Sequence, residues 1–216
     1  MLKTDFENLR NLFRLGDRSK LRIEIRSLIG ELTTSNHVDG ALFYHPLGFL
    51  YATLFSFSND ETIRIHIWNK KYYNVVPQLD IHNHYYRVNS YIYKGCVFNQ
   101  LYKVNDVIDV NVNQYTGSYT KTGGRILTKT DNGLFIIEDI ISTYCEGDLY
   151  TINHDQIHTG GSIAGDIACT IVYTQDPGEK KPLVFGKGPL PDVLSFEVKK
   201  VPSGSIKAIF KDLETC

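Results

Sequence analysis

The feature that most constrains the fold is a long zone, residues 41–174, dominated by short runs rich in Ile, Val, Tyr, Phe and Thr. Gly, Asn and Asp separate these runs, which is typical of turns between strands. Lys94-Gly95 and Asp131-Asn132-Gly133 have the composition of hairpin turns. Since no helical patterns alternate with the strands, we expect an all-β barrel or sandwich. The expected strands are 49–57, 62–68, 79–84, 87–94, 96–104, 107–112, 126–129, 134–138, 148–152 and 167–174.

Helices are expected only at the two ends of the chain. Thr4-Asp5-Phe6-Glu7 has the form of a capping box, and apolar residues recur at helical spacing after it. A second apolar stripe follows Gly16-Asp17, and we expect both helices, within residues 1–33, to pack on the outer face of a sheet. Residues 176–216 are expected to wrap the barrel and to end in a short helix at 205–213. We interpret Asn111–Gly124 as a long loop over the barrel mouth, and the chain as a single domain, residues 1–216.

Composition argues against several classes of partner. The 216 residues carry a net charge of −1, so no basic field attracts nucleic acid or an anionic membrane. No apolar run reaches the roughly 20 residues that span a bilayer, and the first residues lack the apolar core of a signal peptide. Cys96, Cys145, Cys169 and Cys216 have no Cys-x-x-Cys spacing. We therefore expect reduced thiols in a cytoplasmic protein.

Three histidines form the strongest candidate site. His82 and His84 are separated by one residue, so on a β-strand their side chains project from the same face. His158, on a neighbouring strand, would complete one face of a metal's coordination sphere and leave the other positions open. The alternative is that His82-Asn83-His84 is ordinary polar surface on a tyrosine-rich strand.

The patterns around these histidines resemble the two motifs of the cupin superfamily of small jelly-roll barrels. In the first motif, residues 79–95 supply His-x-His and the closing Gly95. The second motif runs Gly, five residues, Pro-x-Gly, two residues, His. Residues 147–158 match this spacing, with Asn for Pro and Asp for Gly. The resemblance covers residues 62–174 and implies an all-β jelly-roll barrel whose metal ligands are His82, His84 and His158.

The departures from the cupin pattern carry information about the metal. Val88 or Asn89 stands where cupins have a metal-binding Glu. A centre of three histidines resembles the thiol dioxygenases, such as cysteine dioxygenase, and implies Fe(II). The same resemblance gives Tyr173 the position of a pocket tyrosine, as a proton donor or a hydroxyl that positions substrate. Ile171 replaces a histidine of that family, and strand 49–57 has no arginine at the matching point, so the resemblance does not extend to a cysteine substrate.

Imidazole ligands alone do not determine which metal binds. Neutral imidazoles bind Fe, Zn, Cu, Ni or Mn without neutralising the metal's charge. Three such ligands on one face leave positions for a bidentate substrate and dioxygen. Each ligating histidine needs an acceptor for its other N–H. Asp80, Asn89 and Asp155 are the candidates, unless they are only polar residues of surface turns.

A second candidate group lies in strand 62–68, where isoleucines alternate with Arg64, His66 and Trp68. If the isoleucines pack under the helices, these three side chains point into the barrel. Arg64 would then bind a carboxylate or phosphate, Trp68 would form a pocket wall, and His66 would be an acid/base group or a fourth ligand. In the opposite orientation the polar set faces water. We favour the first orientation, because an outward Trp beside Arg is unusual.

Two further residues lie close to the motifs. Tyr86 belongs to a tyrosine cluster after the histidine pair that could line a ligand pocket, although strands favour tyrosine in any case. His154 lies four residues before His158, and we expect it on the surface of the same turn.

These observations predict a metal-binding cupin that oxygenates a small polar or anionic molecule with Fe(II). The candidate residues are catalytic Tyr173 and His66, substrate-binding Arg64, Trp68 and Tyr86, and metal-binding His82, His84 and His158. Two other readings stay open: a cupin that binds a nucleotide or sugar without chemistry, and an isomerase or lyase that uses Zn, Ni or Mn. The expected partner is a small-molecule substrate, with no nucleic acid and no membrane, and a homodimer is left open.

Overall fold

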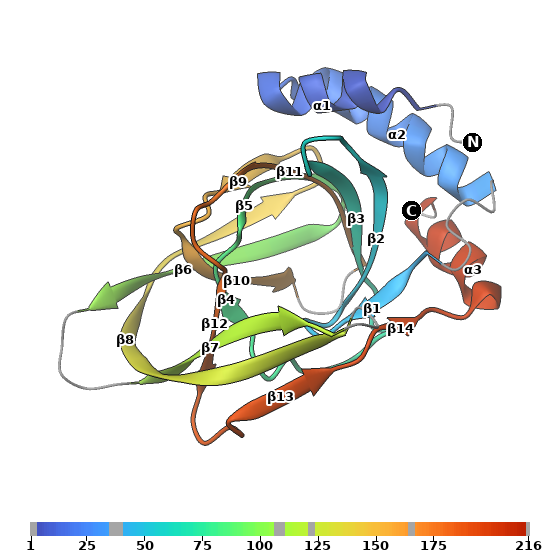
Figure 1. Ribbon diagram of the computed structural model, residues 1–216. Helices are drawn as coiled ribbons and strands as arrows, with labels where there is room; N and C mark the ends of the chain where they lie inside the picture. Colours follow the sequence, from blue (N-terminus) through green and yellow to red (C-terminus); the bar gives the residue numbers. More distant parts are fainter. Residues whose placement is uncertain (1–3, 35–40, 106–110, 121–123, 164–166, 215–216) are drawn as a thin grey trace.

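The computed structural model describes residues 4–34, 41–105, 111–120, 124–163 and 167–214. Its strands form two antiparallel sheets of seven strands each, and three helices lie outside them (Figure 1). This is the predicted all-β class with helices at the two ends, and it is consistent with a jelly-roll β-sandwich.

The two N-terminal helices form as their apolar spacing predicts. Helix α1 (Phe6–Leu15) ends at Gly16, which adopts the left-handed conformation (φ 66°) that glycine tolerates. Its cap is Asp5, whose carboxylate accepts a hydrogen bond from the Asn8 N–H at 3.1 Å. Thr4 is not the cap, because its hydroxyl donates to Glu31 of helix α2 (Arg18–Thr34) at 3.2 Å.

The sheet that lies beneath the helices, sheet A, has the strand order β14-β1-β2-β3-β11-β5-β9. Its neighbouring strands are all antiparallel. Its strands are β1 (Phe43–His45), β2 (Phe49–Ser56), β3 (Thr62–Trp68), β5 (Tyr86–Lys94), β9 (Leu149–Ile152), β11 (Ala168–Pro177) and β14 (Lys199–Lys200).

The second sheet, sheet B, has the order β13-β8-β6-β10-β4-β12-β7, and an additional pairing of β7 with β8 makes it curl back on itself. Side chains from its own strands, among them Ile81, Ile157 and Phe185, form a small apolar cluster. Its strands are β4 (Ile81–His82), β6 (Cys96–Asn105), β7 (Val112–Tyr119), β8 (Arg125–Cys145), β10 (Ile157–Ser162), β12 (Leu183–Lys187) and β13 (Val193–Phe196).

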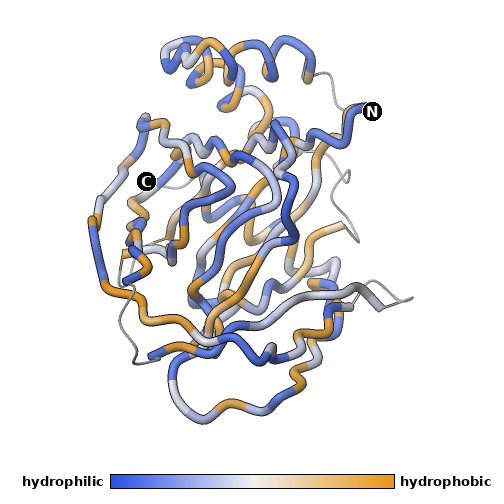
Figure 2. Tube along the Cα trace, turned by 60° about the vertical axis from the view of Figure 1, so that its left-hand side comes forward, coloured by the Kyte–Doolittle hydropathy of each residue, from blue (hydrophilic) through white to orange (hydrophobic). Residues whose placement is uncertain are grey.

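The largest core lies between the helices and the outer face of sheet A. The apolar stripes of α1, α2 and the C-terminal helix α3 (Ser203–Glu214) pack there against Ile63, Ile65 and Ile67 of β3. Hydrophobic and hydrophilic residues alternate along these helices, as expected for helices with one buried face (Figure 2). Since side chains alternate along a strand, the neighbours of these isoleucines point to the inner face of sheet A.

Two predicted hairpin turns and one predicted loop are wrong. Lys94-Gly95 does not join paired strands, because β5 belongs to sheet A and β6 to sheet B. Residues 131–133 lie inside β8, which continues because Gly133 pairs with Asn113 of β7. Asn111–Gly124 is mainly strand β7, and residues 121–123 and the first part of the predicted strand 107–112 lie outside the described residues. In each case the pairing with strands distant in the chain, and not the local turn composition, determines the backbone conformation.

The C-terminal segment contributes more than the predicted wrap. Strand β12 lies between β4 and β7 in sheet B, β13 extends the same sheet, and β14 pairs with β1 in sheet A. The predicted helix 205–213 is present as α3. The segment is therefore part of both sheets.

The prediction of reduced cysteines is wrong for two of the four. Cys96, at the start of β6, pairs across the ladder with Cys145, at the end of β8, and the two form a disulfide with a Cα–Cα distance of 4.1 Å. Cys169 is a buried free thiol, and Cys216 lies outside the described residues. The predicted cytoplasmic location relied on reduced thiols and loses that support.

Among the described residues, no helix combines the length and the apolar character needed to cross a membrane.

Candidate metal centre

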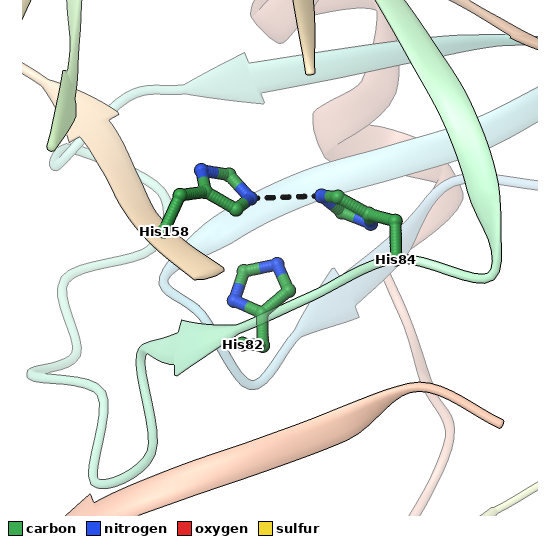
Figure 3. A group of neighbouring side chains, drawn as sticks. All are labelled: His82, His84 and His158. Atoms are coloured by element: carbon green, nitrogen blue, oxygen red, sulfur yellow. Dashed lines mark hydrogen bonds between the residues drawn. The ribbon is translucent and has the colours of Figure 1, made fainter. Parts of the chain in front are cut away.

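The three predicted histidines lie together on the inner side of sheet B (Figure 3). His82 ends the two-residue strand β4 and faces His158 of β10 in register. His84 follows in the link from β4 to β5. The ring centroids are 4.6 Å apart for His82 and His158, 4.8 Å for His82 and His84, and 4.9 Å for His84 and His158.

Asn83, between the first two histidines, fixes this segment against β12. Its backbone N–H donates to the Leu183 carbonyl at 3.1 Å, and its side-chain Oδ1 accepts from the Leu183 N–H at 2.6 Å. Strand β4 therefore has β10 on one side and β12 on the other. This double attachment holds His82 and His84 toward His158.

The ring nitrogens converge closely enough to share one ion. One nitrogen of each histidine lies within 4.8 Å of the others, and Nε2 of His84 is 2.8 Å from Nε2 of His158. Among the described residues this group contains histidines alone, without a carboxylate. Its composition matches the predicted three-histidine centre.

The hydrogen bonds of two rings determine which nitrogen is available. Nδ1 of His82 is 2.8 Å from the Asp80 carbonyl, and Nδ1 of His158 is 2.7 Å from Oδ1 of Asn99. Both oxygens only accept, so each Nδ1 carries the proton and each Nε2 presents its lone pair. The geometry thus places two ligand nitrogens in the form that a metal requires.

The structure changes the set of predicted acceptors. Asp80 acts through its backbone carbonyl, while its carboxylate accepts from the Thr159 hydroxyl at 3.1 Å. Asn89 lies on the outer face of sheet A and accepts from Thr151 at 2.9 Å, and Asp155 is exposed. Asn99 was missed. Its polar side chain beside Val97 and Phe98 was only a weak signal, because Gln100 and Lys103 of the same strand are also polar.

Burial keeps all three imidazoles neutral. Desolvation lowers the pKa of His82, and it lowers the pKa values of His84 and His158 well below the usual range. A neutral imidazole retains the lone pair that binds a metal. With the proton of His158 on Nδ1, the 2.8 Å contact makes Nε2 of His84 a hydrogen-bond donor to Nε2 of His158. The donor set fits a divalent transition metal once this His84 proton moves from Nε2 to Nδ1.

The polar residues of β3 lie on the inner face of sheet A, since its isoleucines pack against the helices. His66 stacks on Phe49 with centroids 4.6 Å apart, and Trp68 lies 5.1 Å from the same ring. Burial, followed by the charge of Arg64, lowers the pKa of His66 to about 3. His66 does not belong to the three-histidine group. Its catalytic role and the binding roles of Arg64 and Trp68 remain predictions.

Tyr173 lies on the opposite face of its sheet from β3's polar residues. Its hydroxyl donates to Glu61 at 2.7 Å and accepts from Arg14 of α1 at 2.9 Å. It is fully buried in the core beneath the helices. The structure therefore does not bring the predicted catalytic tyrosine to the histidines, and the resemblance placed it on the wrong side of β11.

Two other residues singled out from the sequence, Tyr86 and His154, lie outside the three-histidine group. Tyr86 begins β5, and its ring meets that of Tyr85 edge-on with centroids 4.9 Å apart. Its role in substrate binding stays a prediction. His154 is exposed in the turn before β10, as expected, and is outside the three-histidine group.

His45 is a further histidine on the inner face of sheet A that the sequence does not point to, because His45-Pro46-Leu47-Gly48 has only the composition of a turn entering a strand. In the structure His45 ends β1 opposite Phe49. The two rings stack with centroids 4.3 Å apart and an interplanar angle of 7°. A histidine directly before the turn 46–48 gives no local signal of this position.

The two antiparallel sheets and the histidine cluster are compatible with a cupin-like β-sandwich metal site. No protein-family model matches the chain, and no curated protein matches it either.

Proposed function

We propose that this protein is a cupin-like metalloprotein in which His82, His84 and His158 bind one divalent transition metal, and that it is an Fe(II)-dependent oxygenase of a small polar or anionic molecule. The observation that supports the proposal is the convergence of three neutral imidazoles, two of them with the Nε2 lone pair fixed toward the centre by Asp80 and Asn99. Three imidazoles on one face leave coordination positions for a substrate.

When bound, the metal would supply Lewis acidity and, as iron, access to dioxygen chemistry. The chain's own residues orient and enclose the reactants. The Asp80 carbonyl and Asn99 hold two ligand rings in one orientation. Arg64, on the inner face of sheet A, would attract an anionic substrate, and the rings of Phe49 and Trp68 would exclude water from its apolar part.

The direct test is metal analysis of protein purified without oxygen from cells supplied with iron, zinc, nickel and manganese. One equivalent of iron supports the oxygenase. Another metal at one equivalent refutes the oxygenase and favours an isomerase or lyase. If the wild-type protein contains no metal, the proposed metal site is refuted. The remaining hypothesis is then a protein that binds a small molecule without chemistry.

Matched variants assign the ligands. His82→Ala, His84→Ala and His158→Ala should each lose stoichiometric metal, whereas His154→Ala, which removes an exposed histidine of the same chain, should retain it. Asn99→Leu removes only the acceptor of His158, so its metal affinity should fall roughly 10- to 100-fold. Full metal content in the three ligand variants would exclude the assignment.

A further inference from the structure

His45 lies on the inner face of sheet A, on the same wall as His66. The ring of Phe49 stacks on His45 at 4.3 Å and on His66 at 4.6 Å, because β2 lies between β1 and β3. Tyr51 closes the edge of the His45 ring at 5.3 Å. These contacts fix the plane of the His45 imidazole.

One hydrogen bond fixes the tautomer of His45. The Leu47 backbone N–H donates to Nδ1 of His45 at 3.2 Å. Nδ1 must therefore present its lone pair, and in the neutral ring the proton resides on Nε2. Among the described residues, Nε2 of His45 has no hydrogen-bond partner.

This arrangement is the opposite of that in the proposed ligands. His82 and His158 carry the proton on Nδ1 and present the Nε2 lone pair. His45 instead presents Nε2–H, which can donate but cannot bind a metal in this form. Of these three inner histidines, His82 and His158 present lone pairs that a metal can bind, and His45 presents a hydrogen-bond donor.

The positive charge near His45 at neutral pH comes from two guanidinium groups, because the neighbouring His66 and His82 are neutral. Burial lowers the pKa of His45 well below the usual range, and the nearby groups His66, His82, Arg125 and Arg64 lower it further. The guanidinium groups come from both sheets, Arg64 from β3 and Arg125 from β8. Arg125 lies against Gly117 of β7, where an added Cβ would come within 2.9 Å of its Nε. A ligand between the sheets therefore meets cationic groups on two sides.

We propose that His45 donates a hydrogen bond from Nε2–H to an anionic ligand at the three-histidine centre, and that this ligand is a small carboxylate. The inference rests on the proposed metal site and adds the class of its ligand. A carboxylate offers acceptor oxygens to the metal, to His45 and to the guanidinium groups. The rings of His45, Phe49, His66 and Trp68 cover the wall of sheet A, which favours a small molecule.

The test uses the full chain loaded with Co(II), whose visible absorption reports changes in coordination. Oxalate, a small dicarboxylate, is titrated into wild type, His45→Phe, His45→Gln and His154→Phe. His45→Phe keeps a ring on Phe49 but removes the N–H, so we expect full Co(II) binding with oxalate affinity at least about 10-fold weaker. His45→Gln, which keeps an N–H donor, should recover part of the affinity, and His154→Phe should match wild type.

The outcomes separate this inference from the proposed function. If wild type does not bind Co(II), the metal site itself fails. If wild type binds Co(II) but oxalate leaves its spectrum unchanged, or if inorganic phosphate binds more tightly than oxalate, the carboxylate class is wrong. Unchanged oxalate affinity in His45→Phe, or loss of its Co(II), overturns the role of His45.

A measurement on wild type keeps the inference testable if a variant does not fold. Long-range ¹H–¹⁵N correlation spectra of the imidazole rings distinguish the two neutral tautomers. We expect the proton on Nε2 in His45 and on Nδ1 in His82 and His158. A proton on Nδ1 of His45 refutes the proposed donor.

Discussion

Replacing Tyr173 with Phe tests whether this residue stabilises the fold or takes part in chemistry. The change removes one oxygen that joins Glu61, Arg14 of α1 and strand β11. The ring remains, with its contact to Phe13 at 5.7 Å. Burial and the neighbouring Glu61 raise the pKa of Tyr173, so the hydroxyl stays protonated and donates to the carboxylate at neutral pH.

The magnitude follows from the two lost hydrogen bonds. The Glu61 side chain is only 5% exposed, so its bond from Tyr173 counts in full, at about 1.5–3 kcal/mol for a charged acceptor. The Arg14 side chain is 43% exposed and keeps its bond to the other Glu61 oxygen at 2.7 Å. Losing the hydrogen bond from Arg14 to the Tyr173 hydroxyl therefore adds little to the cost. We expect the free energy of unfolding to fall by about 1.5–3 kcal/mol and Tm by about 3–12 °C.

Chemical denaturation followed by circular dichroism measures this loss. Tyr91→Phe is the matched control, because Tyr91 lies in the same core but its hydroxyl has no hydrogen bond among the described residues. That variant should change stability by less than about 0.5 kcal/mol. Metal content should be unchanged in both. Tyr173→Phe with wild-type stability and a defect in metal or ligand binding would refute this reasoning.

Three other perturbations test the fold and the inner face. Removal of residues 1–34 exposes the isoleucine face of β3 and should cause aggregation, visible by light scattering; a soluble and equally stable protein would refute the packing argument. His66 has a pKa near 3 in the fold and about 6.5 when unfolded, so the unfolded state binds more protons between these values. The unfolding free energy of metal-free protein should therefore fall by about 1.4 kcal/mol per pH unit more in wild type than in His66→Phe as pH is lowered through this window; equal slopes would contradict the buried neutral ring. Gly95→Ala places a Cβ onto the Ile167 carbonyl at positive φ and should cost more than about 2 kcal/mol, whereas Gly147→Ala, also at positive φ but with open space, should cost about 1. Similar losses in both would show that the close approach at Gly95 is unimportant.

His82 and His84 were predicted as a pair because side chains alternate along a strand, but strand β4 is only Ile81–His82 and His84 lies in the link after it. Their proximity comes from the attachment of this segment to β10 and β12, and His158 followed from the spacing of a second motif. The inward face of β3 was also predictable, since its isoleucines alternate strictly with polar residues.

Strand β11 offers no such alternation, because it is buried on both faces from Ala168 to Gln175. The sequence therefore could not tell that Tyr173 shares its face with Ile171 and points to the helices. The sequence Lys94-Gly95 likewise fits either a hairpin or a link between two sheets. Which of the two forms depends on the strands that β5 and β6 pair with. Asn99 becomes a functional candidate through His158, 59 residues later in the chain, and His45 through its place on the inner face of sheet A near Arg64 and Arg125.

The position of β12 has a consequence for the order in which the protein matures during synthesis. Asn83, between two proposed ligands, is bonded to Leu183, one hundred positions later in the chain. A nascent chain that has emerged only as far as His158 contains all three histidines but lacks the strand that supports two of them. We therefore expect the metal site to acquire its geometry only after β12 has left the ribosome, so metal loading would follow translation rather than guide it.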